Sequence, residues 1–346
     1  MKILVIRFRQ MGDAILGTSL LNTLRDSFPD AQIDFVLNER LARLFEGHPS
    51  LSHVITFTDD ERHHVLTYLR KVRRVVTQTH YDAIIDLRST VNTMPFALFS
   101  RRTKYRIGLA KPYSRLAYNY VQPECRADES MIDHNLAMLR PLRQEGTLKP
   151  NKQFTLSLTE DERADYRRYL TSKGLDLRRP ILLVGVTAKL PHKTWDEERM
   201  TWTLRQFMVE WPEVQVIFNY APGREKENAL RIYERLGRPS DVFIDVEARS
   251  QRELVALADA CTLYFGNEGG ARHVAHACGR PSFVVCAPGS SKTKWLPQNA
   301  TPAEGVAPTD LADVTAMPRE QQYRLITAEE VWARFREMCV RLKLFG

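Results

Sequence analysis

The 346-residue sequence lacks any long apolar run. Uninterrupted apolar stretches such as Ile3 to Ile6, Ile181 to Val184 and Phe283 to Cys286 fall far short of the ~20 residues that a membrane-spanning helix needs. The four apolar residues before Arg7 are also too few for the apolar region of a secretory signal. We therefore expect a cytoplasmic protein without a membrane-spanning segment.

Cysteine is scarce and forms no recognisable pattern. No C-x-x-C pair occurs and the number of cysteines is odd, so we interpret them as small buried apolar residues in a reducing compartment. No zinc motif is present, and we expect no bound metal. The five are Cys125, Cys261, Cys278, Cys286 and Cys339.

The usual dinucleotide fingerprint is missing from the first strand-helix loop. Gly12 and Gly17 do not satisfy G-x-G-x-x-G, which argues against an NAD-dependent enzyme. Internal repeats and low-complexity tracts are also absent.

Positive charge is in excess, with 50 Lys and Arg against 42 Asp and Glu and a formal net charge of +8. Such a balance implies an anionic partner, whether a nucleotide, a nucleic acid or an anionic lipid. Charge alone does not choose among them.

Strand-like apolar segments alternate with helical patterns along the chain. A strand over residues 2–7, a helix through residues 14–24 and a strand over residues 32–37 make an opening βαβ unit, which favours a parallel sheet. The next expected elements include a basic helix from Glu61 to Gln78 and a helix from Val91 to Leu98.

Two α/β domains are the simplest account of a chain of this length. The polar segment Gln144 to Gln153 has no apolar periodicity and is the expected linker. This places one domain at residues 1–150 and a second at 151–326. Residues 327–346 hold a last helix with one apolar stripe.

The stretch of residues 263–288 predicts a strand, a tight loop, a helix and a second strand. Gly269 and Gly270 stand where the helix begins, and Glu268 directly precedes them. A helix N-terminus presents unpaired N–H donors and about half a positive charge, which suits a phosphate. The alternative is an ordinary glycine-rich turn of an α/β protein.

Three separated motifs resemble glycosyltransferase family 9, the heptosyltransferases of bacterial lipopolysaccharide core assembly. Arg7 and Gly12-Asp13 look like the family's opening motif, and Lys193-Thr194-Trp195 is similar to its Lys-x-Trp loop. The run from Gly266 to His273 matches its Gly-Asn-Asp-Thr/Ser-Gly-x-x-His motif. The likeness in order and spacing extends from Met1 to about Pro297.

The resemblance implies a GT-B fold, in which two Rossmann-like domains face each other across a cleft and the last helix often packs back on the first domain. It also implies an inverting, metal-independent transferase that needs no cofactor beyond its nucleotide-sugar donor. The donor, heptose-like and ADP-linked, would bind the second domain. The acceptor, a lipopolysaccharide core or related anionic glycolipid, would bind the first domain, with peripheral contact at the cytoplasmic face of the inner membrane.

Asp13 and Lys193 are the expected catalytic residues. The resemblance makes Asp13 the base that takes the acceptor hydroxyl proton, and the alternative is an ordinary helix N-cap. Lys193, with the N–H groups of Gly269, Gly270 and Ala271, would hold the leaving nucleoside diphosphate. A solvated loop lysine is the alternative.

Further donor contacts are expected from Thr187 and Ala188, toward phosphate or base, and from Glu225, toward the ribose hydroxyls. Glu268 stands where the family usually has Asp, and Gly269 where it has Thr or Ser. We therefore expect altered contacts to the donor sugar, and poor use or a shifted pose of ADP-heptose. His273 packs or caps the helix in this interpretation and is not catalytic.

A basic, tyrosine-rich segment between Phe99 and Arg126 is the expected docking face for the anionic acceptor. The alternatives are a solvated surface and a single-stranded nucleic-acid site, but no RNA-binding signature accompanies it. The expected acceptor-binding residues are Arg101, Arg102, Lys104, Arg106, Lys111 and Arg115.

Other functions compete with this prediction. Asp13 and Glu268 could form the carboxylate pair of a hydrolase, but their placement in separate domains favours transfer. A transferase with another donor or a polysaccharide acceptor, and a nucleotide-binding GT-B protein without turnover, remain alternatives.

Overall fold

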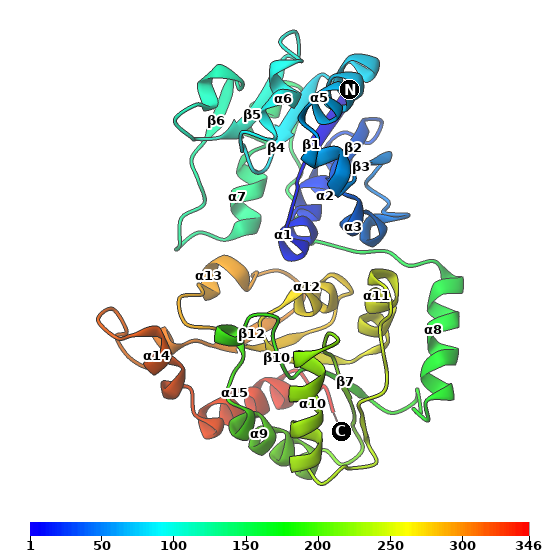
Figure 1. Cartoon of the computed structure of the whole chain (residues 1–346), viewed down its shortest axis with the longest axis vertical. Helices are drawn as coiled ribbons and strands as arrows, with labels where there is room; N and C mark the ends of the chain where they lie inside the picture. Colours follow the sequence, from blue (N-terminus) through cyan, green and yellow to red (C-terminus); the bar gives the residue numbers. More distant parts are fainter. Residues whose placement is uncertain (346) are drawn as a thin grey trace. The chain divides into compact units, whose positions relative to one another are not determined.

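The computed structural model describes residues 1–345, which form two α/β units, residues 1–157 and 158–345 (Figure 1). The first unit alternates strands and helices from its first residue onward. Its strands are β1 (Lys2–Ile6), β2 (Gln32–Asn38), β3 (His53–Phe57), β4 (Ala83–Asp86), β5 (Tyr105–Leu109) and β6 (Tyr120–Gln122), and its helices are α1 (Met11–Leu16), α2 (Thr18–Ser27), α3 (Glu39–Ala42), α4 (Asp59–His63), α5 (Val65–Thr79), α6 (Met94–Leu98) and α7 (Met131–Ala137).

The second unit repeats the same alternation, and its first long helix begins at a Thr159–Glu162 capping box. Its strands are β7 (Ile181–Gly185), β8 (Gln215–Phe218), β9 (Val242–Phe243), β10 (Leu263–Asn267), β11 (Ser282–Val285) and β12 (Ala303–Val306), and its helices are α8 (Glu160–Ser172), α9 (Glu197–Glu210), α10 (Arg224–Arg235), α11 (Gln251–Ala260), α12 (Gly270–Ala277), α13 (Lys292–Trp295), α14 (Arg319–Leu325) and α15 (Ala328–Arg341).

Each unit is built on one parallel six-stranded sheet. The orders are β3-β2-β1-β4-β5-β6 and β12-β11-β10-β7-β8-β9, so both sheets have the Rossmann order 3-2-1-4-5-6. The strand order reverses between β1 and β4 in the first sheet and between β7 and β10 in the second. In open parallel sheets, ligands bind outside the carboxyl ends of the strands at such a switch point.

The strands are apolar because both faces of each sheet are covered. In the first unit, Leu4 and Ile6 of β1 share a buried cluster with Val72 and Val76 of α5, while α2 and α7 pack on each other. In the second unit, α11 packs on both α8 and α12. The helices α9, α10 and α15 share a separate buried cluster with the strands.

The last helix packs within the second unit, and the expectation that it also packs back on the first domain stays a prediction. Phe335 of α15 stacks on Phe265 of β10 at 4.4 Å between ring centroids and on Phe207 of α9 at 5.6 Å. Its predicted apolar stripe is therefore part of this unit's core. None of the helices within residues 1–345 is both long and apolar enough to span a membrane.

Some elements differ from their predicted bounds. The basic helix over residues 61–78 is two helices, because α4 ends at His63 and His64 is extended before α5. The expected linker continues to Ser157, and its Asn151 and Thr155 bond to side chains of α2. The short elements β6, α7 and β12 were not predicted.

Candidate functional site

The candidate donor loop lies at the switch point of the second sheet, directly after β10. Gly266 has φ +131°, and a Cβ there would lie 2.4 Å from the carbonyl oxygen of Gly185, the last residue of β7. Glycine is therefore required where the two strand ends approach each other.

Gly269 differs from Gly266 both in its backbone conformation and in the space available to a Cβ. It is the N-cap of α12 in extended conformation, and no side chain caps this helix. A Cβ at Gly269 would meet nothing within 4 Å. The first N–H groups of α12, including those of Gly270 and Ala271, are thus left without a side-chain acceptor, which is the arrangement that suits an anion.

Asn267 holds the neighbouring loop against this one, a role that the sequence analysis missed. The side chain is buried; its Oδ1 accepts from the N–H of Trp195 at 2.7 Å and its Nδ2 donates to the carbonyl of Gly185 at 2.9 Å. The Trp195 indole in turn donates to the carbonyl of Ile326 at 3.1 Å. An asparagine at the end of a buried strand was the available signal, because a buried amide needs partners.

This anchoring brings Lys193 to the donor loop. Lys193 ends a short 3-10 turn and its Nζ lies 3.6 Å from Oε2 of Glu268. The Lys193 side chain is 40% exposed and the Glu268 side chain 17%. The structure thus combines a partly exposed cation, a carboxylate and an uncapped helix N-terminus.

Thr187 and Glu225 are hydrogen-bonded to each other. The buried Thr187 donates from Oγ1 to Oε2 of Glu225 at 3.1 Å, and the same oxygen accepts from the N–H of Ala221 at 3.3 Å. The N–H of Ala188 donates to Oγ1 of Thr194 at 3.1 Å. The donor contacts expected of Thr187, Ala188 and Glu225 stay predictions.

The helix α12 carries two buried basic residues, Arg272 and His276. Arg272 donates to the carbonyl of Trp295 at 2.7 Å, and its Nη1 has no hydrogen-bond partner among the described residues. Burial lowers the pKa of Arg272 to about 10, which leaves it charged at neutral pH. Burial and that charge lower the pKa of His276 to about 3 and hold the pKa of His273 well below its usual value. Both histidines are therefore neutral, and His273 packs edge-on against the Trp295 ring as expected of a structural residue.

Asp13 lies at the corresponding switch point of the first sheet. It is the third residue of α1, not the N-cap, and its Oδ2 lies 2.8 Å from a guanidinium nitrogen of Arg7. Arg7 also donates to the carbonyl of Leu87, just after β4, at 2.6 Å. Arg7 therefore links the ends of β1 and β4 and holds the Asp13 carboxylate, which is 18% exposed.

The basic segment divides into structural and free cations. Arg106 donates to the carbonyls of Ala117, Arg101 and Thr103, Lys104 pairs with Glu145 at 2.5 Å and Lys111 pairs with Glu124. Within residues 1–345 no side-chain partner is present for the remaining three, which are exposed. These are Arg101, Arg102 and Arg115.

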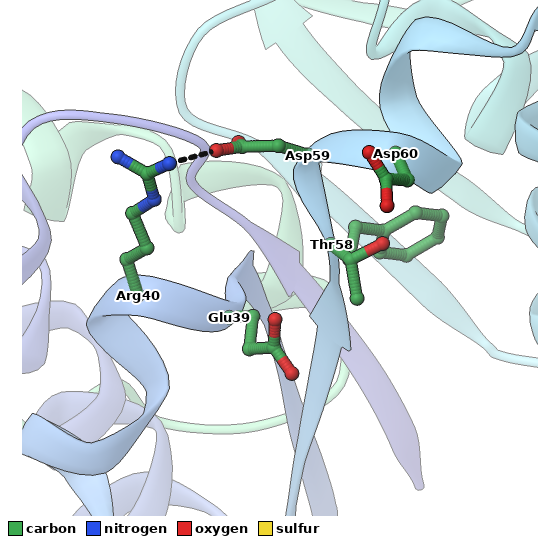
Figure 2. Close-up of a pocket in the computed structure, with 6 residues that line it drawn as sticks. Glu39, Arg40, Thr58, Asp59 and Asp60 are labelled. Carbon is green, nitrogen blue, oxygen red and sulfur yellow. Dashed lines mark ion pairs between the residues drawn. The ribbon is translucent and has the colours of Figure 1, made fainter.

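A separate hollow of about 220 Å³ lies at the carboxyl ends of β2 and β3 (Figure 2). Its lining carries the carboxylates of Glu39, Asp59 and Asp60. Arg40 is the one cation in the lining and pairs with Asp59 at 2.5 Å. An acidic lining repels phosphate, so this hollow does not suit a nucleotide.

Comparisons with known proteins point to one family. The family model of glycosyltransferase family 9 (heptosyltransferase) matches residues 69–301. Lipopolysaccharide heptosyltransferase 1 of Campylobacter coli is 22% identical over 295 residues, covering 82% of this chain and 83% of that protein.

Two solved structures show the fold. A glycosyl transferase family 9 protein from Veillonella parvula has a TM-score of 0.84 at 18% identity and covers 98% of this chain and 97% of its own. E. coli heptosyltransferase WaaC with ADP has a TM-score of 0.72 at 17% identity and covers 97% and 99%. The predicted fold class, α/β of the GT-B type, is confirmed. With a family model that matches two thirds of its length, the chain belongs to glycosyltransferase family 9 and is a glycosyltransferase.

Proposed function

We propose that this protein is an inverting, metal-independent transferase that moves a heptose-like sugar from an ADP-linked donor to a lipopolysaccharide core or related glycolipid. The observation that carries the proposal is the uncapped N-terminus of α12 with Lys193 and Glu268 beside it, at the switch point of the second sheet. The names of the relatives give the substrate class: one is a lipopolysaccharide heptosyltransferase and another was solved with ADP.

In the proposed reaction the donor's diphosphate binds the first N–H groups of α12. As the bond between the anomeric carbon and the β-phosphate oxygen breaks, its electron pair passes to the diphosphate. The N–H groups, the Lys193 ammonium and the buried charge of Arg272 stabilise that negative charge. No metal is required for this role.

Asp13 is the proposed base. The acceptor hydroxyl attacks the anomeric carbon on the face opposite the leaving diphosphate, which inverts the configuration, and its proton passes to the Asp13 carboxylate. Support comes from the Arg7 pair, which orients the carboxylate while leaving it partly exposed.

Glu268 and Gly269 are the proposed determinants of donor choice. Glu reaches one methylene further than the Asp usual in the family, and the open space at Gly269 leaves room where a Thr or Ser hydroxyl would stand. We expect poor use of ADP-heptose, or a shifted pose. A Glu268→Asp, Gly269→Thr double variant should raise kcat/KM for ADP-heptose relative to other donors by roughly tenfold or more, since charge-assisted hydrogen bonds contribute about 1.5 to 3 kcal/mol.

For the anionic acceptor we propose the unpaired cations Arg101, Arg102 and Arg115. Charge reversal at Arg102 should raise the acceptor KM and flatten its dependence on salt, because the charge is exposed and unpaired. Arg106→Lys is the contrasting variant, since Arg106 donates to three backbone carbonyls. Its substitution should lower stability more than acceptor affinity.

We also propose that α5 makes the peripheral contact with the inner membrane. Val65 and Leu66 at its start are 67% and 70% exposed. Arg70 and Arg73 follow Leu66 at helical spacing and are exposed as well. Apolar side chains followed by arginines on one face suit an anionic bilayer surface.

The experiment is a transfer assay with a panel of ADP-, UDP-, GDP- and CMP-linked sugars and a core oligosaccharide acceptor, with and without EDTA. We expect transfer from an ADP-linked sugar, with the inverted anomer seen by NMR and rates unchanged by EDTA. Transfer from another nucleotide-sugar would change the donor assignment. Nucleotide binding without transfer or donor hydrolysis would favour the alternative of a nucleotide-binding protein without turnover.

A further inference from the structure

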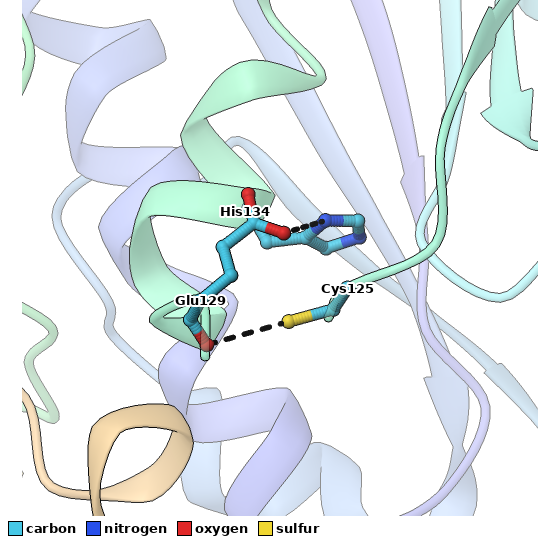
Figure 3. Close-up of side chains that lie close together, drawn as sticks. All are labelled: Cys125, Glu129 and His134. Atoms are coloured by element: carbon cyan, nitrogen blue, oxygen red, sulfur yellow. Dashed lines mark hydrogen bonds and ion pairs between the residues drawn. The ribbon is translucent and has the colours of Figure 1, made fainter. Parts of the chain in front are cut away.

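Three potential metal ligands meet in the connection between β6 and α7 (Figure 3). The thiol of Cys125, the carboxylate of Glu129 and the imidazole of His134 each offer one atom, and the three atoms lie within 4.8 Å of one another. These are ordinary zinc ligands, because Cys sulfur, His nitrogen and carboxylate oxygen are the atoms that bind Zn²⁺ in proteins.

The separations suit a metal ion better than a direct contact. Nδ1 of His134 lies 3.6 Å from Oε2 of Glu129, beyond hydrogen-bond distance. Zinc bonds of about 2.0 to 2.3 Å in a tetrahedron place neighbouring ligand atoms roughly 3.3 to 3.6 Å apart. The observed spacing therefore needs only small side-chain adjustments to admit an ion.

The local backbone already brings the ligands together. Ser130 caps α7 through the N–H of Ile132, which places Glu129 just before the helix and His134 one turn into it. The Cys125 thiol faces the carbonyl of Glu129 at 3.7 Å. His134 is only 4% exposed, so one ligand is fixed by packing, whereas Cys125 is half-buried and reachable from solvent.

The neighbouring charges do not compete for the position. Asp128 is paired with Arg126 at 2.7 Å and Asp133 with Lys152 at 2.7 Å. The cluster itself thus offers three protein ligands, and a fourth tetrahedral position is left for water or an exogenous group.

We propose that Cys125, Glu129 and His134 form a zinc-binding site that ties the β6–α7 connection to α7. The Cys125 thiol loses its proton to solvent as the zinc–sulfur bond forms. The spacing Cys-x3-Glu-x4-His is not one of the common zinc patterns, so the expectation of no metal from the sequence did not include it. That expectation also treated all cysteines as buried, which is wrong for Cys125.

The site is separate from the transfer chemistry proposed above, in which no residue of this cluster takes part. Its structural effect would reach α7 and the helix α2 on which α7 packs. A bound ion would therefore stabilise the first unit without serving as a catalyst.

The test uses the full-length protein, stripped of metal by a chelator and titrated with Zn²⁺ against a chromophoric zinc indicator. We expect one tight equivalent per chain. Cys125→Ser and Glu129→Gln should each weaken binding by at least tenfold, whereas Cys278→Ser, at the other half-buried cysteine, should leave it unchanged. Co²⁺ added to the wild type should give a sulfur-to-cobalt absorption band that Cys125→Ser abolishes.

A second measurement does not depend on any variant's folding. Zn²⁺ should slow alkylation of Cys125 in the wild type, followed by peptide mass spectrometry, while Cys278 serves as the internal reference. The proposed site would be overturned if the wild type bound no tight equivalent of Zn²⁺. It would also be overturned if Cys125→Ser bound Zn²⁺ as the wild type does and Zn²⁺ left the alkylation rate of Cys125 unchanged.

Discussion

The two units repeat one sheet topology, but their switch points differ in chemistry. In the first unit, Arg7 closes on Asp13 at 2.8 Å and both side chains are largely buried. In the second, Lys193 and Glu268 lie 3.6 Å apart beside a helix N-terminus that no side chain caps, and the lysine is more exposed than Arg7. The switch point thus holds a carboxylate paired with an arginine in one unit and an uncapped helix N-terminus beside a lysine in the other.

This difference shows that the sheet topology sets where the switch point lies, whereas the residues of the loops set its chemistry. A carboxylate oriented by an arginine is suited to receive a proton, whereas free N–H groups and an exposed ammonium are suited to receive phosphates. In the proposed mechanism the first unit therefore takes the proton and the second binds the donor, and substitutions in each unit test the two roles separately.

The largest expected effect comes from Asp13→Asn. This change keeps the shape of the side chain but removes the base, so transfer should fall by roughly 10² to 10⁴. Initial rates at saturating donor and acceptor measure it, with circular dichroism as the control for folding. Near-normal turnover would remove Asp13 from the proposed mechanism.

The two glycines of the donor loop should differ in stability. Gly266→Ala forces a Cβ against the Gly185 carbonyl in a conformation that L residues rarely adopt, so we expect a loss of about 1 to 3 kcal/mol. Gly269→Ala meets open space and should cost little. All five tryptophans lie in the second unit, so urea unfolding followed by their fluorescence reports this unit. Equal losses in the two variants would contradict the distinction.

Acid should destabilise the second unit through its buried histidines. An unfolded histidine has a pKa near ~6.5, whereas that of His276 is lowered to about 3. Between these pH values the unfolded chain binds one more proton than the folded chain. The free energy of unfolding therefore decreases as the pH is lowered, by about 1.4 kcal/mol per pH unit for each such histidine.

His276→Gln should flatten that slope between pH 6.5 and pH 5, measured by tryptophan fluorescence in urea, a window that starts at the ordinary pKa of histidine (~6.5). Gln can still reach Asn299, which bonds His276 at 2.9 Å. The exposed His192 of the same unit offers the matched control, His192→Gln. A slope unaltered by His276→Gln would mean that this buried ring takes up its proton in the folded state.

The sequence predicted the fold well because its signals are local. Apolar strands such as β1 and β7 and the glycine-rich turn before α12 can be identified from neighbouring residues alone. Short elements such as β6 depend on tertiary packing and were missed.

The site was predictable only in part. Motif residues such as Lys193 and Glu268 do lie together, but the bond between Asn267 and Trp195 joins residues 72 positions apart. Partners distant in the sequence also occur in the basic segment. Lys104 pairs with Glu145, and Arg106 donates to the carbonyl of Ala117. Charge patterns cannot show which cations are already paired.

Calorimetric titration of ADP into the wild type, Lys193→Ala and Asp13→Asn tests the division of roles most directly. We predict that Lys193→Ala weakens ADP binding by roughly tenfold or more, about 1.4 kcal/mol, because its ammonium meets the diphosphate. Asp13→Asn should bind ADP as the wild type does. Unchanged affinity in Lys193→Ala, or a loss confined to Asp13→Asn, would contradict the assignment of the donor to the second unit.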